Sequence, residues 1–268
     1  MEMHRPSGAF ANLAGDLRLW RLEGMARPDL RRTLRLAEAA RAATMRRAEA
    51  RTGSPLLPSC LHGPSRAKAP HRHAYWLPHD LDGDGRLDHL AVHVPGGLCA
   101  EGAELLDGIV EIRLDGHGRL DLVPIPEGPT WAAVMGPARL WLSAVPFFGA
   151  LHDTRGSGPQ RPGLDVASQL LRELGRLGRC LPAVEIAELS GAASGSEGFL
   201  HGKRTRLRRP SQPVSGWFAL AFAHPVAGPL AVGFGAHFGL GRFRPPLPNR
   251  EGGGETRKIL TRPENTAL

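Results

Sequence analysis

The order of alternating and helical segments between residues 17 and 124 constrains the fold of this chain more than any other feature. LRLWRLEG (17–24) alternates apolar and polar side chains like a strand, and residues 32–51 repeat Leu, Ala and Met at helical spacing. HRHAYWLPHD and LDHLAVHV alternate again, and LDGDGR between them is typical of a hairpin turn. A short helix over 100–109 and the strands VEIRL and RLDLVPI follow. The predicted order is β-α-β-β-α-β, the ferredoxin-like arrangement.

A second cycle begins with the strand ARLWLSAVPFF (138–148) and continues with a helix over 164–178 and the strands AVEIAEL and GWFALAFAHP. PLAVGFGAHFG is predicted to be a short helix with Pro229 at its first position, before a last strand in LGRFRP. The predicted fold class is therefore α+β. It comprises two tandem ferredoxin-like (RRM-like) domains, an N-terminal one over residues 17–130 and a C-terminal one over residues 131–245 that carries the glycine-rich loop. A disordered tail follows over residues 246–268.

The charge of the chain is concentrated at its two ends. The 268 residues carry a formal net charge of +8 and the sequence pI is about 10.5. Residues 1–70 hold 13 basic and 6 acidic side chains and residues 201–268 hold 11 and 3, whereas residues 71–130 hold 4 and 11. This balance favours a polyanionic partner, which the two basic ends would contact.

The cysteines and the first residues bear on the compartment. Cys60, Cys99 and Cys180 are odd in number and form no CxxC pair, which predicts neither a disulfide framework nor a zinc ribbon and fits a reducing cytoplasm. MEMHRPSGAF lacks the apolar core of a signal peptide, and no run approaches the roughly 18 to 20 apolar residues of a membrane span. We therefore expect a cytoplasmic protein that is neither exported nor inserted into a membrane.

The segment GFGAHFGLGRFRP combines glycines, aromatic side chains and arginines, a combination that suits an RNA-contacting loop. A tight turn before a last core strand is the alternative. Upstream, HGKRTRLRRP places five cations within seven residues, enough for strongly salt-dependent phosphate binding, although such a run can also be a solvated loop. His237 suits stacking on a base or holding the loop better than acid-base chemistry. The predicted RNA-binding residues of the two segments are Lys203, Arg204, Arg206, Arg208, Arg209, Gly233, Gly235, His237, Phe238, Gly239, Gly241 and Arg242.

Four blocks of the chain carry a family resemblance: LEGMARPDLRRTLRLAEAARAATM, HRHAYWLPHDLDGDGRLDHLAVHVPGG, LWLSAVPFFGALH and GPLAVGFGAHFGLGRF. Together, over residues 17–245, they resemble the CRISPR-associated RAMP superfamily. The resemblance is to the Cas-six-like C-terminal half of the Csb-type Cas-five/Cas-six fusion subunit of type I-U (I-G) systems. That subunit is about twice as long, and its Cas-five-like half has no counterpart here, so a split subunit, a truncated gene and a degraded locus all stay open.

The resemblance implies a CRISPR RNA processing endoribonuclease that cuts the precursor's repeat and stays bound to its product. Its partners would be repeat RNA or crRNA and other subunits of a type I effector complex. His152 matches a position of the family and joins the predicted RNA-binding residues. The family often places its catalytic histidine near the end of the first helix and the following loop, which corresponds here to His62, His71 and His73.

RNA carries its own nucleophile, the 2′-hydroxyl, so its cleavage needs a general base, a general acid and charge stabilisation but no metal or other cofactor. A histidine with its ordinary pKa of about 6.5 suits the base. In a strand over HRHAYWL, His71, His73 and Tyr75 share one face, and His89 and His93 lie on the same face of the paired strand. An open sheet face of this kind would suit a nuclease site. The predicted catalytic residues are therefore His73, then His71, as the base, together with Tyr75. The alternative is ordinary surface or hydrogen-bonded histidines.

Two groups of side chains bear on whether the site holds a metal. Asp80, Asp82, Asp84 and Asp88 fit positions 1, 3, 5 and 9 of a calcium loop, but Ala91 occupies position 12, where the strongest ligand belongs. A polar hairpin turn built on Asp-Gly pairs fits equally well, and the four histidines lack the ligand spacing of a zinc site. We therefore predict no metal in the site. A non-catalytic crRNA-binding subunit and a calcium-stabilised structural module are the alternative functions.

Overall fold

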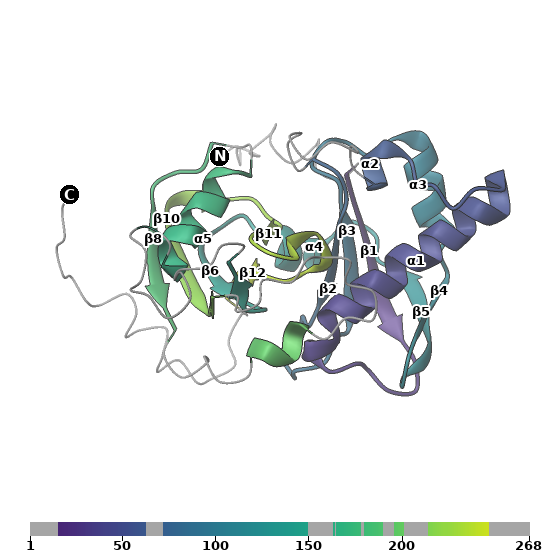
Figure 1. Cartoon of the computed structure of the whole chain (residues 1–268), viewed down its shortest axis with the longest axis horizontal. Helices are drawn as coiled ribbons and strands as arrows, with labels where there is room; N and C mark the ends of the chain where they lie inside the picture. The colour runs from purple at the N-terminus through teal and green to yellow at the C-terminus, as the bar shows by residue number, and fades with distance from the viewer. Residues whose placement is uncertain are drawn as a thin grey trace, which may run out of the picture.

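The chain folds around two five-stranded antiparallel sheets that lie side by side (Figure 1). Helices α1 and α3 cover the outer face of the first sheet, and α5 packs on the second. No helix in the described ranges is long and apolar enough to cross a membrane. The computed structural model describes residues 16–62, 72–149, 163, 165–177, 180–189, 196–200 and 214–246.

The first sheet has the strand order β2-β3-β1-β5-β4, and every neighbouring pair is antiparallel. Without β4, which forms a hairpin with β5, this is the order 4-1-3-2 that a β-α-β-β-α-β chain adopts in the ferredoxin-like fold. The predicted order of the first half is confirmed. The strands are β1 (Leu17–Glu23), β2 (Tyr75–His79), β3 (His89–His93), β4 (Glu111–Leu114) and β5 (Gly118–Pro124).

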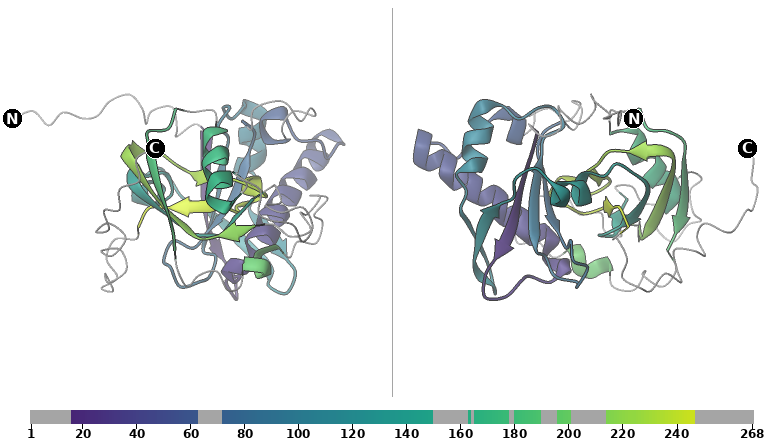
Figure 2. Two further views of the ribbon diagram at one scale, coloured as in Figure 1. Left: turned by 60° about the vertical axis from the view of Figure 1, so that its left-hand side comes forward. Right: turned by 180° about the vertical axis from the view of Figure 1, so that it is seen from behind.

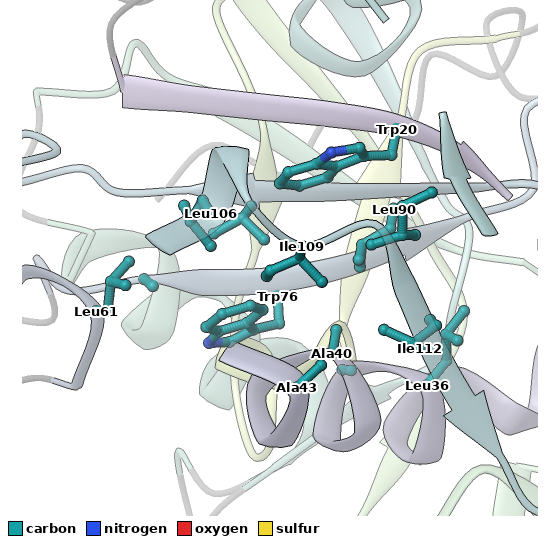
Figure 3. Close-up of a cluster of buried hydrophobic side chains, with 14 of the residues drawn as sticks. Trp20, Leu36, Ala40, Ala43, Leu61, Trp76, Leu90, Leu106, Ile109 and Ile112 are labelled. Carbon is teal, nitrogen blue, oxygen red and sulfur yellow. The ribbon is translucent and has the colours of Figure 1, made fainter. Parts of the chain in front are cut away.

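Apolar residues at helical spacing explain how α1 (Thr33–Thr52) covers this sheet. Leu36, Ala40 and Ala43 are buried on one side of the helix, where Ala40 and Ala43 lie near Trp76 of β2 and Leu36 lies near Ile112 of β4 (Figure 3). Gly53 ends the helix in the left-handed conformation, and its N–H bonds the Glu49 carbonyl. The short helices α2 (Ser59–His62) and α3 (Ala100–Asp107) complete this layer.

The second sheet has the order β11-β12-β6-β10-β8. Without β11 the order is again 4-1-3-2, so the second ferredoxin-like unit is confirmed as well. Helix α5 (Val166–Gly175) buries Leu170 and Leu174 against it, and Asp165 caps its first turn by accepting the Ser168 N–H. The strands are β6 (Ala138–Ser143), β8 (Val184–Glu188), β10 (Phe218–Val226), β11 (Leu230–Ala231) and β12 (Arg242–Arg244), with β7 (Phe147–Phe148) and β9 (Ser215–Gly216) paired separately.

The short helix predicted from Pro229 onward is wrong. The chain forms the two-residue strand β11 there, then a turn with the 3-10 helix η4 (Ala236–Phe238). Four glycines of this turn have positive φ angles, between 58° and 89°, which a right-handed helix does not contain. Two further 3-10 helices, η2 (Leu30–Arg32) and η3 (Ser196–Leu200), lie beside each other near the start of α1.

The inner face of the first sheet is not open, contrary to the prediction from its histidines. Side chains alternate as expected, with Trp76 on the α1 side and Tyr75 and Leu77 on the other. That other side packs against Met135 and Ala231, so the second half of the chain covers it, as the two orientations in Figure 2 illustrate.

Helix α4 (Pro129–Met135) connects the two units and contributes to this covered face. The predicted boundary between residues 130 and 131 falls inside α4, and we propose that the boundary lies within the segment 125–137. From residue 247 onward the predicted tail lies outside the described residues.

Candidate functional site

The glycine-rich turn between β11 and β12 packs on β2 and on the start of α1. Gly239, with φ of 83°, comes so close that a Cβ atom there would lie 2.9 Å from Thr33 Cγ2 and 3.0 Å from Pro78 Cδ. Gly233 is equally confined, because its Cβ would lie 2.5 Å from the Phe148 carbonyl oxygen. These glycines permit close contact between protein segments, which corresponds to the tight-turn alternative.

His237, in η4 of this turn, stacks on two rings at the start of β2, those of His73 and Tyr75. Its ring centroid lies 4.0 Å from that of His73, with the planes 4° apart. It also lies 4.0 Å from that of Tyr75, with the planes 28° apart. Tyr75 is 7% exposed, whereas His73 and His237 are half-buried. The structure therefore joins two half-buried imidazoles, one from each unit, that are 164 residues apart in the sequence.

A hydrogen bond fixes the orientation of the His237 ring. Its Nδ1 lies 3.1 Å from the carbonyl oxygen of Ala74, the residue between His73 and Tyr75. A carbonyl only accepts, so Nδ1 carries the proton. In neutral His237 the lone pair is then on Nε2, the tautomer in which Nε2 can take a proton from a substrate.

At the opposite end of β2 from Tyr75, His79 contacts Arg242 of β12. Arg242 Nη1 donates to His79 Nδ1 over 2.9 Å, and the exposed fractions of these residues are 0% and 1%. Burial, then the charges of Arg242, His89 and Arg244, hold the pKa of His79 well below its ordinary value. His79 is therefore neutral at neutral pH and can accept this bond.

The charge of Arg242 is also unusual for its position. Burial, then Arg244, lowers the pKa of Arg242 to about 9, while the charges of Asp80 and Asp88 act in the opposite direction. The guanidinium still stays protonated at neutral pH, between the two sheets. A buried guanidinium cannot meet an RNA phosphate, which corrects the prediction that Arg242 contacts RNA directly.

The remaining predicted residues fall into three groups. Phe238 packs against the apolar core of the first sheet, so its ring contacts protein side chains. Gly235 and Gly241, like Gly233 and Gly239, shape the turn. The others lie outside the described residues: His71, His152, Lys203, Arg204, Arg206, Arg208 and Arg209.

The aspartates of the β2–β3 hairpin use their carboxylates to hold the turn. Asp80 accepts the backbone N–H groups of Gly83 and Gly85, at 2.7 and 2.9 Å, and Asp82 pairs with Arg27 at 2.9 Å. The carboxylates of Asp80, Asp82 and Asp88 lie within 4.8 Å of one another, but Asp84 is not in this group. In the described ranges no histidine joins a group that could hold a metal.

Sequence reasoning missed the pair His79 and Arg242. The signal was present: His79 lies two and four residues beyond Leu77 and Tyr75 on the same face of an alternating strand. What periodicity does not reveal is the partner, because the contact depends on how the second unit packs on that face.

No protein-family model and no curated protein matches the chain. The chain is similar to a solved structure described as a RAMP protein binding different RNA substrates, at 12% identity and a TM-score of 0.42, covering 85% of this chain and 98% of that one. It is also similar to a product complex of Cas6, at 12% identity and a TM-score of 0.37, with the same coverage.

Proposed function

We propose that this protein is a metal-independent endoribonuclease that binds and cleaves CRISPR repeat RNA. The stacked pair His73 and His237 carries the proposal, because the centroids of these two half-buried imidazoles lie 4.0 Å apart where the two units meet. Two cations at such a distance repel by about 1 kcal/mol in water and by several times more where water is excluded. The pair therefore binds one proton more readily than two, which leaves one ring as base and the other as acid.

His73 remains the first choice for the base that takes the proton of the 2′-hydroxyl. His237 then serves as its partner, protonating the leaving 5′-oxygen; the opposite assignment is equally compatible with the tautomer set by the Ala74 carbonyl. Tyr75, which is buried, positions His237 by stacking. The products would be a 2′,3′-cyclic phosphate and a 5′-hydroxyl, as balance of the displacement requires.

The RNA is held by the basic segments. Lys203, Arg204, Arg206, Arg208 and Arg209 lie outside the described residues, and their number in so short a segment supports phosphate binding. The motifs shared with the RAMP superfamily support the same substrate, while the relation to the Csb-type subunit and the supply of a Cas-five-like half stay predictions.

A non-catalytic crRNA-binding subunit is the second candidate. The contacts of His237 favour this candidate, because its hydrogen bond to the Ala74 carbonyl and its stacking on His73 also hold the two units together. That role needs no catalysis.

The test is incubation with CRISPR repeat RNA in EDTA. The proposed nuclease yields a product with a cyclic phosphate, and a 2′-deoxy substitution at the cut nucleotide abolishes cleavage while binding persists. His73→Ala and His237→Ala each lower the rate by roughly 10²-fold or more. A shifted but uncut RNA would establish the binding subunit instead, and undiminished cleavage in both variants would remove the two histidines from the site.

A further inference from the structure

A groove of about 660 Å³ lies at the end of the first sheet that is remote from β2. One wall is the second half of α1, with Arg46, Arg47 and Ala50, and the other is the start of β4. Figure 1 shows this end of α1 next to β4 and away from the second sheet. The groove is therefore separate from the histidine stack.

Its second wall is a free sheet edge, because β4 pairs only with β5 in the described part of the chain. The Leu122 N–H bonds the Val110 carbonyl at 2.9 Å. In an antiparallel ladder, hydrogen-bonded residues alternate, so the backbone groups of Glu111 and Arg113 point away from β5. Both therefore offer an N–H and a C=O to another strand.

The groove is positively charged. Arg46 and Arg47 are exposed, and among the described residues neither has a carboxylate within ion-pair distance. Arg113 faces Glu111 at 3.4 Å, but Glu111 is also neutralised by Arg119 at 3.0 Å. Arginine in this setting favours carboxylates, which it binds with two N–H groups at once.

The groove also has an apolar part. The side chain of Val110 is 65% exposed at its edge, and Ile109 is buried beneath. An exposed β-branched side chain beside a free strand edge is a surface that another strand would cover.

We propose that this groove binds an extended acidic segment of a partner protein, which adds a strand to the free edge of β4. Its backbone pairs with Glu111 and Arg113, its carboxylates meet Arg46 and Arg47, and an apolar side chain covers Val110. RNA would use the arginines but not the backbone donors of β4, and this difference separates the two ligands. The proposal does not depend on the proposed nuclease activity.

The test is an NMR titration of the full chain with the acetylated and amidated peptide Glu-Val-Glu-Val-Glu-Val. The backbone amides of Glu111 and Arg113 shift on binding, while the matching Lys-Val peptide has no effect. If these amides do not shift at peptide concentrations up to about 1 mM, the proposal is overturned. It is also overturned if a twelve-nucleotide uridine RNA causes the same shifts.

Two pairs of variants locate the binding. Arg113→Pro removes an outward N–H that does not bond to β5, and Arg113→Ala removes the same side chain but keeps this N–H. We therefore expect peptide affinity to fall about tenfold more in Arg113→Pro than in Arg113→Ala. Arg46→Glu combined with Arg47→Glu also weakens binding at least about tenfold, whereas Arg172→Glu on α5 does not. The arginine pair is decisive if Arg113→Pro fails to fold, and equal affinities across these variants would contradict the groove as the site.

Discussion

At the scale of single residues, the buried pair His79 and Arg242 makes the junction between the units sensitive to pH. His79 is buried in its neutral form with Arg242, His89 and Arg244 facing it, so a proton on its ring adds a cation where cations already meet. The pKa of His79 is therefore lower in the folded than in the unfolded chain. The unfolded state binds more protons below the ordinary pKa of about 6.5, and acid destabilises the fold.

We predict that the contribution of His79 to the free energy of unfolding is constant above about pH 6.5. At lower pH this contribution decreases, by at most about 1.4 kcal/mol per pH unit. Replacing His79 by Met, which does not titrate, lowers stability at pH 7.5 but flattens this slope. Denaturant unfolding at pH 7.5, 6.5 and 5.5 measures both effects. The exposed His224 is the control, since His224→Gln leaves the slope in place; an unchanged slope in His79→Met would refute the assignment.

At the scale of elements, the glycine-rich turn takes the place of the helix that usually precedes the last strand of a ferredoxin-like unit. Its four positive φ angles direct the chain onto the first sheet, where η4 presents His237 to His73 and Tyr75. The turn is thus the element that joins the two units at the site. Its fit depends on the absence of side chains at the points of closest approach.

Gly239→Ala tests this fit, and Gly116→Ala is its matched control. The φ angles are 83° and 80°, so both variants bear the same left-handed strain of about 1–2 kcal/mol. A Cβ at Gly116 meets nothing within 4 Å, whereas at Gly239 it meets Thr33 and Pro78. We expect Gly239→Ala to lose more stability in denaturant unfolding and to lower RNA cleavage, with cleavage by Gly116→Ala unchanged. Equal losses of stability would mean that the turn is not tightly packed.

At the scale of the whole molecule, the net charge of +8 predicts that RNA binding depends strongly on salt. For single-stranded RNA each phosphate contact contributes about 0.7 to the slope of log affinity against log salt concentration. Replacing Arg204, Arg206 and Arg208 by Ala is expected to make the slope shallower by about 2. Filter binding at several salt concentrations gives the slope, and Arg46→Ala with Arg47→Ala, in the groove beside β4, is expected to leave it unchanged.

The sequence predicts the two ferredoxin-like units because both depend on local periodicity, which distinguishes the strands on either side of the long helix α1 from the helix itself. It does not predict which face the other unit covers, so His79 was missed. For the same reason the sequence predicts an RNA contact for Arg242, because it cannot distinguish a cation in solvent from one buried between sheets. The density of glycines between β11 and β12 indicates that the backbone approaches another segment closely. It does not indicate that this segment is β2 and the start of α1.

The most direct measurement is a double-mutant cycle for His73 and His237 in single-turnover cleavage of repeat RNA. If both imidazoles act on one phosphate, each Ala variant loses roughly 10²-fold or more and the double variant loses little beyond the worse single variant. Losses that multiply would show two residues acting independently, and uncut RNA with the unmodified protein would show that the stack is not a catalytic site. Either result would contradict the proposal that His73 and His237, brought together by the packing of the two units, catalyse cleavage jointly.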